Sequence, residues 1–530
     1  MPRITIDNRE VEVEPGSTIL DAAETLGLEI PTLCFLKGRR PCTSCFVCVV
    51  KVNGRENLLP ACATRAEEGM RVQSDTPEVH QARRMALELL LSDHLGDCEG
   101  PCHRVCPAHM NIPLMIRRIA AGDLRSAVAT VKADIALPAV LGRICPAPCE
   151  RACRRAAADK SLSIMLLKRY VADADLASAA PYLPARKAAS GRKVAIIGAG
   201  PTGLAAAYYL LQEGHACTLF DEHDAPGGML RYAVPEERLP RDVLDAEIAV
   251  IARLGAEFRL RTRIGTDPSL ERLRKDFGAV VVAVGKQQAG AADVLGLPAA
   301  DKGITVDGRS LQTAVAGVFA GGDAVRPQRL TVRAVADGKA MAASIAEYLA
   351  GRPVAGPRRS FNIHIGHLRE GEMAKFMAGA SAEARLSPSG DGGGFRDDEA
   401  RRESLRCLHC DCRKPDDCKL RRYAGVYDAK GARYKEERRI FEQRGDHPDI
   451  IYEPGKCIDC GLCIQIATAA KEPLGLTFVG RGFDVRVGVP FDRSLEEALG
   501  RVAAECIAAC PTAALAWRGI LTAEDAEGKR

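Results

Sequence analysis

The sequence of 530 residues has no long apolar run, no large excess of charge and no export signal. No apolar stretch approaches the roughly 18–20 residues that a bilayer requires, which argues against a transmembrane segment. Lys and Arg number 74 against 69 Asp and Glu, so the formal net charge is only +5, and a nucleic-acid-binding role is not expected. The N-terminus has no basic stretch followed by an apolar one. We therefore expect a cytoplasmic protein.

The sequence also shows no Ser-His-Asp pattern, no paired carboxylates in a motif and no molybdopterin-type domain, so it assigns no catalytic residue. Cysteine, in contrast, is abundant at 21 residues, most of them in tight groups. Because reducing compartments disfavour structural disulfides, a cysteine-rich cytosolic chain usually holds metals or carries out redox chemistry. Closely spaced cysteines cannot easily bridge one another, but their thiolates can converge on one inorganic core.

Chain length and local pattern predict several domains of mixed α/β and α+β type. Single cores rarely exceed about 250 residues, and contents of 47% hydrophobic and 27% charged residues are ordinary for a globular chain. An alternating pattern and then a helical pattern open the chain, a helical region follows, and strand–turn–helix alternation comes next. We expect a first domain at 1–78, a helical domain at 79–185 and an α/β domain at 186–352. A linker at 353–400, a Cys-rich segment at 401–440 and a last domain at 441–530 follow.

Four cysteines of the first domain have the spacing C-x10-C-x2-C-x13-C: Cys34, Cys45, Cys48 and Cys62. A [2Fe–2S] core needs four thiolates, and the plant-type spacing keeps two of them close together on a loop. The segment IPTLCFLKGRRPCTSCFVCVVKV resembles the first domain of the large iron–sulfur subunit of respiratory complex I and of related hydrogenases and formate dehydrogenases. This resemblance implies a β-grasp ferredoxin with one [2Fe–2S] cluster. A zinc site with the same thiolates is the alternative, and Cys42 is interpreted as a bystander.

The helical domain carries two cysteine-containing segments, LLLSDHLGDCEGPCHRVCPAHMNIP and GRICPAPCERAC. Together they resemble the N-terminal domain of the glutamate synthase small subunit and of dihydropyrimidine dehydrogenase, in which ligands from two distant segments interleave around two [4Fe–4S] clusters. The resemblance implies one cluster on Cys98, Cys102 and Cys153. It implies a second cluster on Cys106, Cys145 and Cys149.

Two such clusters need eight ligands, so these six cysteines leave two places open. The family's additional cysteine ahead of the first segment is missing, and His94 is the nearest substitute, since S-D-H-x3-C also resembles the histidine-ligated cluster of complex I. An ordinary histidine at a helix end is the alternative. The family's Glu or Gln ligand on the following helix aligns with Lys168. A protonated lysine has no lone pair to donate, so the second cluster would be three-Cys, externally ligated or labile.

The α/β domain opens with RKVAIIGAGPTGLAAAYYLLQEGHACTLFDE, which reads as a strand, a glycine-rich turn, a helix and a strand ending in an acid. In G-x-G-x-x-G, the glycines permit the tight turn, the approach of backbone to a pyrophosphate and the packing of helix on strand. The helix N-terminus then stabilises the phosphate charge, and the acid can bind a ribose hydroxyl. The candidate residues are Gly198, Gly200, Gly203 and Asp221. A structural Rossmann unit without a cofactor is the alternative.

Later segments favour FAD over NAD. GAVVVAVG, which ends at Gly285, resembles the strand beside the dinucleotide in two-domain flavoproteins, and GVFAGGDAV, with Gly322 and Asp323, resembles the closing FAD motif. PGGMLRYAVPEERLP, which contains Gly228, resembles the glutamate synthase small subunit. In that family an NAD(P)H-binding domain lies between the first two of these motifs, whereas here the intervening segment, 286–316, has only about the length of one βαβ unit. We therefore expect an FAD domain without the NAD(P)H domain.

Two more cysteine groups lie near the C-terminus. RCLHCDCRKPDDC offers four thiolates for a [4Fe–4S] cluster or for zinc: Cys407, Cys410, Cys412 and Cys418. GKCIDCGLCIQ forms the C-x2-C-x2-C loop that wraps three corners of a cubane, and a distant Cys-Pro often supplies the last corner. The predicted ligands are Cys457, Cys460, Cys463 and Cys510, with Cys506 as the rival fourth ligand. This module, including GRGFDVRV, resembles a cluster module of the complex I large subunit, which implies a ferredoxin-like domain.

These features predict an oxidoreductase with one FAD, one [2Fe–2S] cluster and several [4Fe–4S] clusters, between two and four. Flavins exchange electrons singly or in pairs and clusters one at a time, so we expect an electron-transfer subunit of a larger cytoplasmic complex. Its partners would be other oxidoreductase subunits, such as a molybdenum or tungsten enzyme or an NADH-oxidising flavoprotein. The alternatives are a self-sufficient NAD(P)H-dependent FAD enzyme acting on a small substrate and a metal-binding scaffold without turnover.

Overall fold

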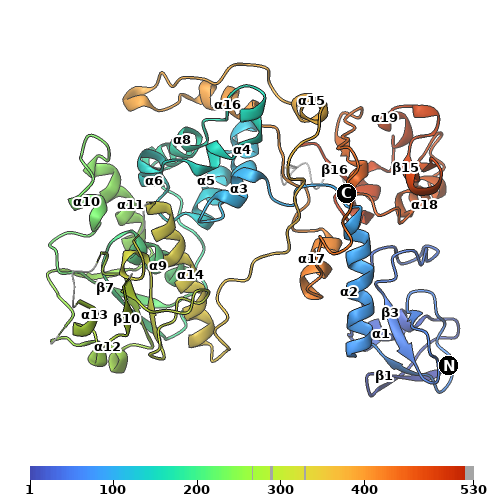
Figure 1. The fold of residues 1–530 in the computed structure, drawn as a ribbon, viewed down its shortest axis with the longest axis horizontal. Helices are drawn as coiled ribbons and strands as arrows, with labels where there is room; N and C mark the ends of the chain where they lie inside the picture. Colours follow the sequence, from blue (N-terminus) through green and yellow to red (C-terminus); the bar gives the residue numbers. More distant parts are fainter. Residues whose placement is uncertain (266, 287–290, 302, 328–329, 520–530) are drawn as a thin grey trace. The chain divides into compact units, whose positions relative to one another are not determined.

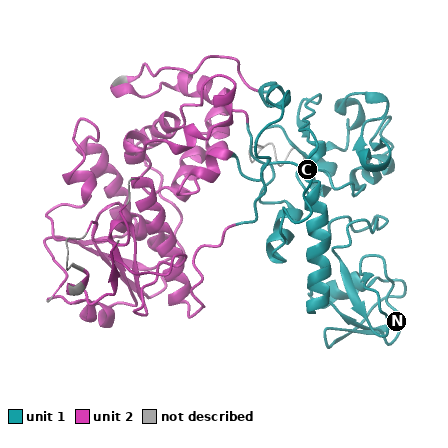
Figure 2. Ribbon diagram, viewed as in Figure 1, with its two compact units in different colours: residues 1–100, 360–379, 409–530 teal, residues 101–359, 380–408 magenta. Residues whose placement is uncertain are grey.

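The chain folds into two compact units, one inserted into the other. The computed structural model describes residues 1–265, 267–286, 291–301, 303–327 and 330–519 (Figure 1). Unit 1 contains residues 1–100, 360–379 and 409–530, and unit 2 contains residues 101–359 and 380–408 (Figure 2). The polypeptide therefore passes between the units four times. Among the helices of the described residues, none combines the length and the apolar character needed to cross a membrane.

The first domain of unit 1 is a mixed five-stranded sheet with one short helix. In the spatial order β2-β1-β5-β3-β4, the strands are Arg9–Glu12, Arg3–Ile6, Arg71–Gln73, Val49–Val52 and Leu59–Pro60. β1 runs antiparallel to β2 and parallel to β5. Helix α1, Ile19–Thr25, begins at a capping box formed by Thr18 and Asp21, and it shares an apolar core with the sheet. The hairpin and helix predicted from the sequence are both present.

Helix α2, Pro77–Ser92, connects this sheet with later parts of unit 1. It begins at the N-cap Thr76 and packs against α17, Lys419–Val426. Arg83 is buried on α2 and donates to the Val49 carbonyl at 3.2 Å and to the Tyr427 hydroxyl at 2.8 Å. A buried guanidinium with these partners fixes α2 between β3 and the chain that follows α17.

The C-terminal part of unit 1 is a small α+β module. β13, Ile450–Tyr452, pairs antiparallel with β16, Leu515–Trp517. The other elements, in chain order, are α18 (Leu462–Ala469), β14 (Thr477–Val479), β15 (Arg486–Gly488), α19 (Leu495–Ala498) and α20 (Ala503–Ala509). α18 packs on α20, and the module has an apolar core of its own.

Unit 2 begins with a group of helices. α3 to α8 are Pro101–Val105, Ile112–Ala120, Leu124–Asp134, Pro138–Ile144, Pro148–Arg151 and Ile164–Ala177. α6 packs on α8 and α4 on α5, and α16, Asp397–Leu405, packs on α4. The predicted helical region is thus present, and residues late in the chain complete it.

The rest of unit 2 is a parallel five-stranded sheet with helices. In the spatial order β12-β9-β6-β7-β8, the strands are Val318–Ala320, Ala279–Val282, Lys193–Ile197, Ala216–Phe220 and Glu257–Arg259. The main helices are α9, α11 and α14 at Pro201–Gln212, Arg241–Arg253 and Thr331–Leu349. β6, α9 and β7 form the strand–turn–helix–strand unit that the sequence predicts, and α14 packs along α9.

The connection between β9 and β12 is short. Its described part contains α13, Ala291–Val294, and the two-residue strands β10, Ala299–Ala300, and β11, Gly303–Ile304. Within residues 283–286, 291–301 and 303–317, the structure contains no second nucleotide-binding sheet. The absence of an NAD(P)H domain stays a prediction.

The segment 353–400, expected to be a linker, contributes to both units. Its residues in unit 1 include α15, Glu372–Met377. Glu372 is buried, accepts a hydrogen bond from the Phe441 backbone N–H at 2.7 Å and forms an ion pair with Arg438. This part of the segment is therefore packed, and the domain limits themselves remain predictions.

Candidate iron–sulfur and dinucleotide sites

The four cysteines predicted for the first cluster lie together and are buried. The Sγ atoms of Cys34 and Cys45 are 3.3 Å apart, and those of Cys48 and Cys62 are 3.4 Å apart. The hydrogen bond with Cys45 lowers the pKa of Cys34 to about 5. The first three thiols lie on the loop between α1 and β3, and Cys62 follows β4. Four convergent buried thiols fit the donor set of a [2Fe–2S] core.

The C-terminal group also converges. Cys457, Cys460, Cys463 and Cys510 line one pocket with Tyr452 and other mostly apolar residues. The left-handed residue Gly461, at φ 71°, starts α18 and places Cys463 in its first turn, while Cys510 ends α20. This set fits a [4Fe–4S] core, whose corners require four thiolates.

Three cysteines lie outside the predicted ligand sets. The rival ligand Cys506 is buried and its thiol donates to the Cys463 carbonyl at 3.7 Å. Cys42 accepts from the Gln465 side chain at 2.9 Å, so it lies beside the C-terminal cysteine loop. Cys217 is buried in β7, as expected of a small apolar side chain.

His94 and Cys98 follow α2, in unit 1, and meet the segment of Cys412. The Cys412 N–H donates to the Cys98 carbonyl at 3.3 Å. The His94 Nδ1 atom is buried, and no hydrogen-bond partner for it is found among the described residues. Burial, together with the charges of Lys456 and Lys435, lowers the pKa of His94 to about 3. The ring is therefore neutral, which is the form that can bind a metal.

A buried ion pair that the sequence does not reveal lies at the same place. Lys456 pairs with Glu453, and both side chains are almost fully buried. A Cβ on Gly96 would lie 2.6 Å from Lys456 Cε, so glycine is what leaves room for the lysine stem. Burial raises the pKa of Cys98 and Cys412, and the charge of Lys456 opposes that rise. The sequence does not mark Lys456 as buried, because Gly96, Cys98 and Cys412, which lie near it, come from distant segments.

In unit 2, Cys106, Cys145 and Cys149 line a pocket together with Lys168. The remaining lining residues are apolar or proline, and no carboxylate or amide side chain is among them. Burial raises the pKa of Cys149 to about 12, and the Lys168 charge opposes this. The pocket thus brings together the three predicted thiols and the lysine that stands where the resembled family has an oxygen or amide ligand.

Cys102, Cys153 and Cys407 all pack on the main apolar core of unit 2. α3, which carries Cys102, packs on α7. The Arg155 guanidinium, two residues after Cys153, donates to the Arg406 carbonyl at 2.5 Å, next to Cys407. Both arginines are fully buried, and the Asp159 carboxylate pairs with each of them. This pair of arginines holds together two segments that are far apart in the sequence.

The glycine-rich turn has the close contacts that its sequence predicts. Gly198 has φ +104°, and a Cβ there would lie 2.3 Å from the Ala283 carbonyl oxygen. A Cβ on Gly203 would lie 1.9 Å from the Gly198 carbonyl oxygen, so α9 packs directly on the turn. Gly200 is the N-cap of α9 and lies against Gly228. These contacts leave the N-terminus of α9 framed by backbone, as a pyrophosphate site requires.

The acidic residues of the cradle are in place. The Asp221 carboxylate accepts from the Ala199 N–H at 2.7 Å and from the His223 N–H at 2.9 Å, so it also braces the turn. Gly322 and Asp323 form a short 3-10 turn after β12, and Gly322 donates to Asp337 at 3.0 Å. Gly285 follows β9 with φ +76°. The structure thus places the predicted residues around the carboxyl ends of β6, β7, β9 and β12; their roles toward a dinucleotide remain predictions.

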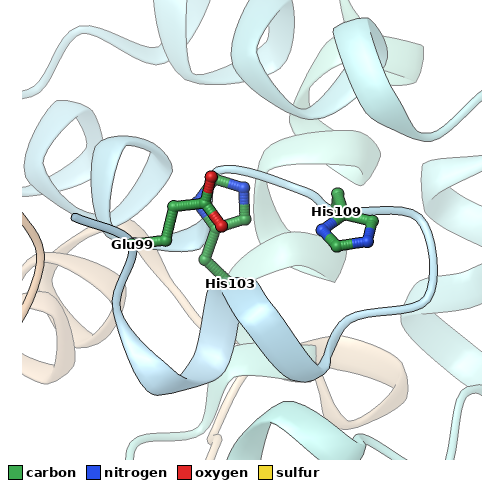
Figure 3. Close-up of side chains that lie close together, drawn as sticks. All are labelled: Glu99, His103 and His109. Atoms are coloured by element: carbon green, nitrogen blue, oxygen red, sulfur yellow. The ribbon is translucent and has the colours of Figure 1, made fainter. Parts of the chain in front are cut away.

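One further group of metal-type ligands lies outside the predicted sets. Figure 3 shows His103 on α3, His109 just beyond it, and Glu99 ahead of the helix. The two histidine rings meet edge to face, with centroids 6.4 Å apart. Glu99 forms an ion pair with Arg421 at 2.7 Å within unit 1. The carboxylate already has a cationic partner, so this group provides no argument for a bound ion.

Three family models match the chain. Residues 2–77 match a 2Fe-2S iron–sulfur cluster binding domain, residues 81–180 match the 4Fe-4S domain II of dihydropyrimidine dehydrogenase, and residues 196–255 match an NAD(P)-binding Rossmann-like domain. The presence of a [2Fe–2S] domain, a [4Fe–4S] domain and a Rossmann-like dinucleotide-binding domain, predicted from the sequence, is therefore confirmed.

Curated relatives cover part of this chain. The NADP(+)-dependent formate dehydrogenase subunit beta of Moorella thermoacetica is 41% identical over 207 residues, 35% of this chain and 29% of that protein. The dihydropyrimidine dehydrogenase subunit PreT of Salmonella typhimurium is 37% identical over 35% of this chain and 46% of its own length. The NADPH glutamate synthase small chain of Mycobacterium tuberculosis is 38% identical over 36% of this chain and 39% of its own length.

The chain thus spans less than half of the length of each of these relatives. The resemblance to the glutamate synthase small subunit and to dihydropyrimidine dehydrogenase, drawn from the motifs, is confirmed for that region. The activity, substrates and partners of the whole protein are proposals.

Proposed function

We propose that this chain is an FAD- and iron–sulfur-containing electron-transfer subunit of a larger cytoplasmic oxidoreductase. The observation that carries the proposal is one continuous apolar core in unit 1 that contains Cys34, Cys45, Cys418 and Cys460. These thiols come from three separate cysteine groups of the sequence. Groups that share one dry core are near neighbours, and burial in such a core sets reduction potentials by excluding water.

The chemistry supplied by the bound groups is one-electron transfer by the clusters, linked to two-electron transfer by FAD. We propose a β-grasp [2Fe–2S] domain with Cys34, Cys45, Cys48 and Cys62 as ligands. We propose [4Fe–4S] clusters on Cys457, Cys460, Cys463 and Cys510 and, with an incomplete set, on Cys106, Cys145 and Cys149. FAD would bind at Gly198, Gly200, Gly203, Asp221, Gly228, Gly285, Gly322 and Asp323.

The partners we propose are other oxidoreductase subunits. Relatives are named as subunits of an NADP(+)-dependent formate dehydrogenase and of a dihydropyrimidine dehydrogenase. A molybdenum or tungsten enzyme, or an NADH-oxidising flavoprotein, would exchange electrons with this chain. Co-purification of the chain from its own cells with such a subunit supports this proposal, and a chain that purifies alone with full turnover contradicts it.

Anaerobic purification of the full chain tests the cofactors. We expect a brown protein with acid-labile sulfide in about equal amount to iron, extractable FAD, and electron paramagnetic resonance signals of both cluster types after reduction. Zinc without sulfide would instead support the scaffold alternative. The variants Cys45→Ala and Cys460→Ala should each remove one signal, and Cys217→Ala, a buried thiol outside these sets, should remove none.

A second function is favoured by one observation, the match of residues 196–255 to an NAD(P)-binding model. The chain would then be a self-sufficient NAD(P)H-dependent FAD enzyme that acts on a small substrate. Mixing the isolated chain anaerobically with NADH or NADPH in a stopped-flow instrument separates the two functions. Flavin bleaching within the turnover time favours this second function, and an unreduced flavin favours the subunit.

A further inference from the structure

The insertion of unit 2 divides the cysteine groups differently from their order in the sequence. Cys98 belongs to unit 1, but Cys102, only four positions later, belongs to unit 2. At the other end, Cys407 belongs to unit 2, whereas Cys410, Cys412 and Cys418 belong to unit 1. Within each of these two cysteine segments, the chain thus passes from one unit to the other.

Within unit 1, the segments on either side of the insertion are joined by backbone hydrogen bonds. The Cys412 N–H donates to the Cys98 carbonyl at 3.3 Å. The Cys98 N–H in turn donates to the Ile363 carbonyl at 3.1 Å, and the Ile365 N–H to the Asp97 carboxylate at 3.0 Å. The chain at Cys98 is therefore fixed against Cys412 by contacts that do not depend on a metal.

Two further side chains with possible metal-ligand atoms, Cys418 and His94, lie near Cys98 and Cys412. Cys418 caps α17, where its Sγ atom accepts from the Arg421 N–H at 3.4 Å. The Arg421 side chain pairs with Glu99, the residue after Cys98, at 2.7 Å, which brings the start of α17 to Cys98. His94 is four residues before Cys98 and presents a buried Nδ1 atom for which the described residues offer no hydrogen bond. A buried imidazole nitrogen without a partner is costly unless a ligand binds it.

The geometry points to a four-ligand iron–sulfur site formed by His94, Cys98, Cys412 and Cys418, a set that the inserted unit 2 splits in the sequence. The inference deepens the proposed function and rests on it. It takes Cys98 out of the ligand set that the sequence predicted for it, together with Cys102 and Cys153. It also separates Cys412 and Cys418 from Cys407, whose segment Arg155 holds next to Cys153.

The regrouping also changes the ligand count in unit 2. With Cys98 removed, Cys102 and Cys153 gain Cys407, which packs on the same apolar core. Unit 2 then offers two sets of three thiols: this one, and Cys106, Cys145 and Cys149. No donor is used twice, and Cys42, Cys217, Cys410 and Cys506 stay outside the sets.

Pairwise alanine variants of the full chain test the site. We expect Cys98→Ala and Cys412→Ala each to lose about four iron atoms, one cubane, and the double variant to lose no more than either. Cys98→Ala with Cys153→Ala should lose about eight, because two different clusters are affected. If instead Cys98 and Cys153 overlap while Cys98 and Cys412 add, the inference is overturned.

His94 has its own test, with a readout that a structural role would not move. His94→Ala should lose the iron of the same cluster, whereas His94→Cys should retain it and change its electron paramagnetic resonance signal, because a thiolate replaces an imidazole. An unchanged spectrum and iron content in His94→Ala would overturn the assignment. If the wild-type chain contains zinc without sulfide, the proposed function fails, yet the pairing can still be read from the overlap in lost metal.

Discussion

Single charged residues beside the thiols are positioned to set reduction potentials. Lys456 is buried near His94, Cys98 and Cys412, and its ammonium is paired with Glu453. Positive charge near a cluster favours the reduced state, which carries one more negative charge, and a buried charge is weakly screened. At the iron–sulfur site proposed above, this ion pair would therefore set the energy of an added electron.

We predict opposite shifts from the two halves of this pair. Lys456→Met should lower the midpoint potential of one cluster by on the order of 50–100 mV, because it removes a buried positive charge. For a one-electron couple, 59 mV corresponds to a tenfold change in the equilibrium constant for reduction. Glu453→Gln should raise the potential of the same cluster. Redox titration followed by electron paramagnetic resonance measures both shifts. Equal potentials in the two variants would contradict this role.

Lys168 is the residue that makes one ligand set incomplete. It lies in the pocket of Cys106, Cys145 and Cys149, where no carboxylate or amide is present. We predict that Lys168→Glu, which supplies a carboxylate, slows the loss of iron from this site to a chelator by at least about tenfold, the effect usual even for residues around the ligands. The exposed Lys160→Glu makes the same charge change and should leave the rate unchanged. Equal rates in the two variants would refute the prediction.

At the scale of elements, α6 shows how the two parts of unit 2 are joined. α6 ends at Ile144 with Cys145 as its C-cap, and its N-cap, Leu137, has no side-chain oxygen for the first N–H groups. The buried Glu247 of α11 accepts from the Val140 N–H at 3.0 Å instead. A carboxylate at a helix N-terminus is favourable, so the dinucleotide domain helps to position a cysteine of the helical domain.

Glu247 should make stability depend on pH. Burial raises its pKa to about 7 in the folded protein, whereas an unfolded glutamate titrates near 4.3. Between these values the folded state binds a proton that the unfolded state has lost, so stability falls as pH rises, by up to about 4 kcal/mol. Glu247→Gln should flatten this dependence between pH 5 and 7 in scanning calorimetry. The exposed Glu236→Gln should keep the wild-type slope, and a wild-type slope in Glu247→Gln would contradict the assignment.

Elements that depend on neighbours in the sequence could be predicted, and contacts between distant segments could not. The first hairpin, α1 and the turn at Gly198 follow from local patterns, and all are present. The contact of Cys98 with Cys412 could not be predicted in this way, because the residues of unit 2 separate the two cysteines in the sequence. Arg155 likewise looks like an ordinary surface arginine in the sequence, yet its contact with Arg406 joins residues 251 positions apart.

At the scale of the whole molecule, iron should matter more to unit 1 than to the sheet of unit 2. The unit 1 core includes Cys34, Cys45, Cys418 and Cys460, whereas one core of the dinucleotide-binding sheet contains no cysteine. Metal binding adds to folding free energy where the ligands are part of the core.

We therefore predict an uneven loss of protection in the apoprotein. In hydrogen-exchange mass spectrometry after chelation, peptides that contain Cys45 or Cys460 should exchange at least about tenfold faster, a loss of about 1.4 kcal/mol or more. Peptides from α12, Leu270–Asp276, whose buried leucines pack in the core without cysteine, should change little. The holoprotein is the matched control, and equal acceleration in both regions would contradict the prediction.

The insertion of unit 2 has a consequence for biosynthesis. Cys98 leaves the ribosome long before Cys412, with the whole of unit 2 translated between them. At translation rates of about 5–20 residues per second, that delay lasts roughly 15–60 seconds. During this interval the nascent chain carries a thiol whose partner segment has not yet been made. Assembly of unit 1 must therefore wait for the last part of translation, while unit 2 can begin to fold earlier.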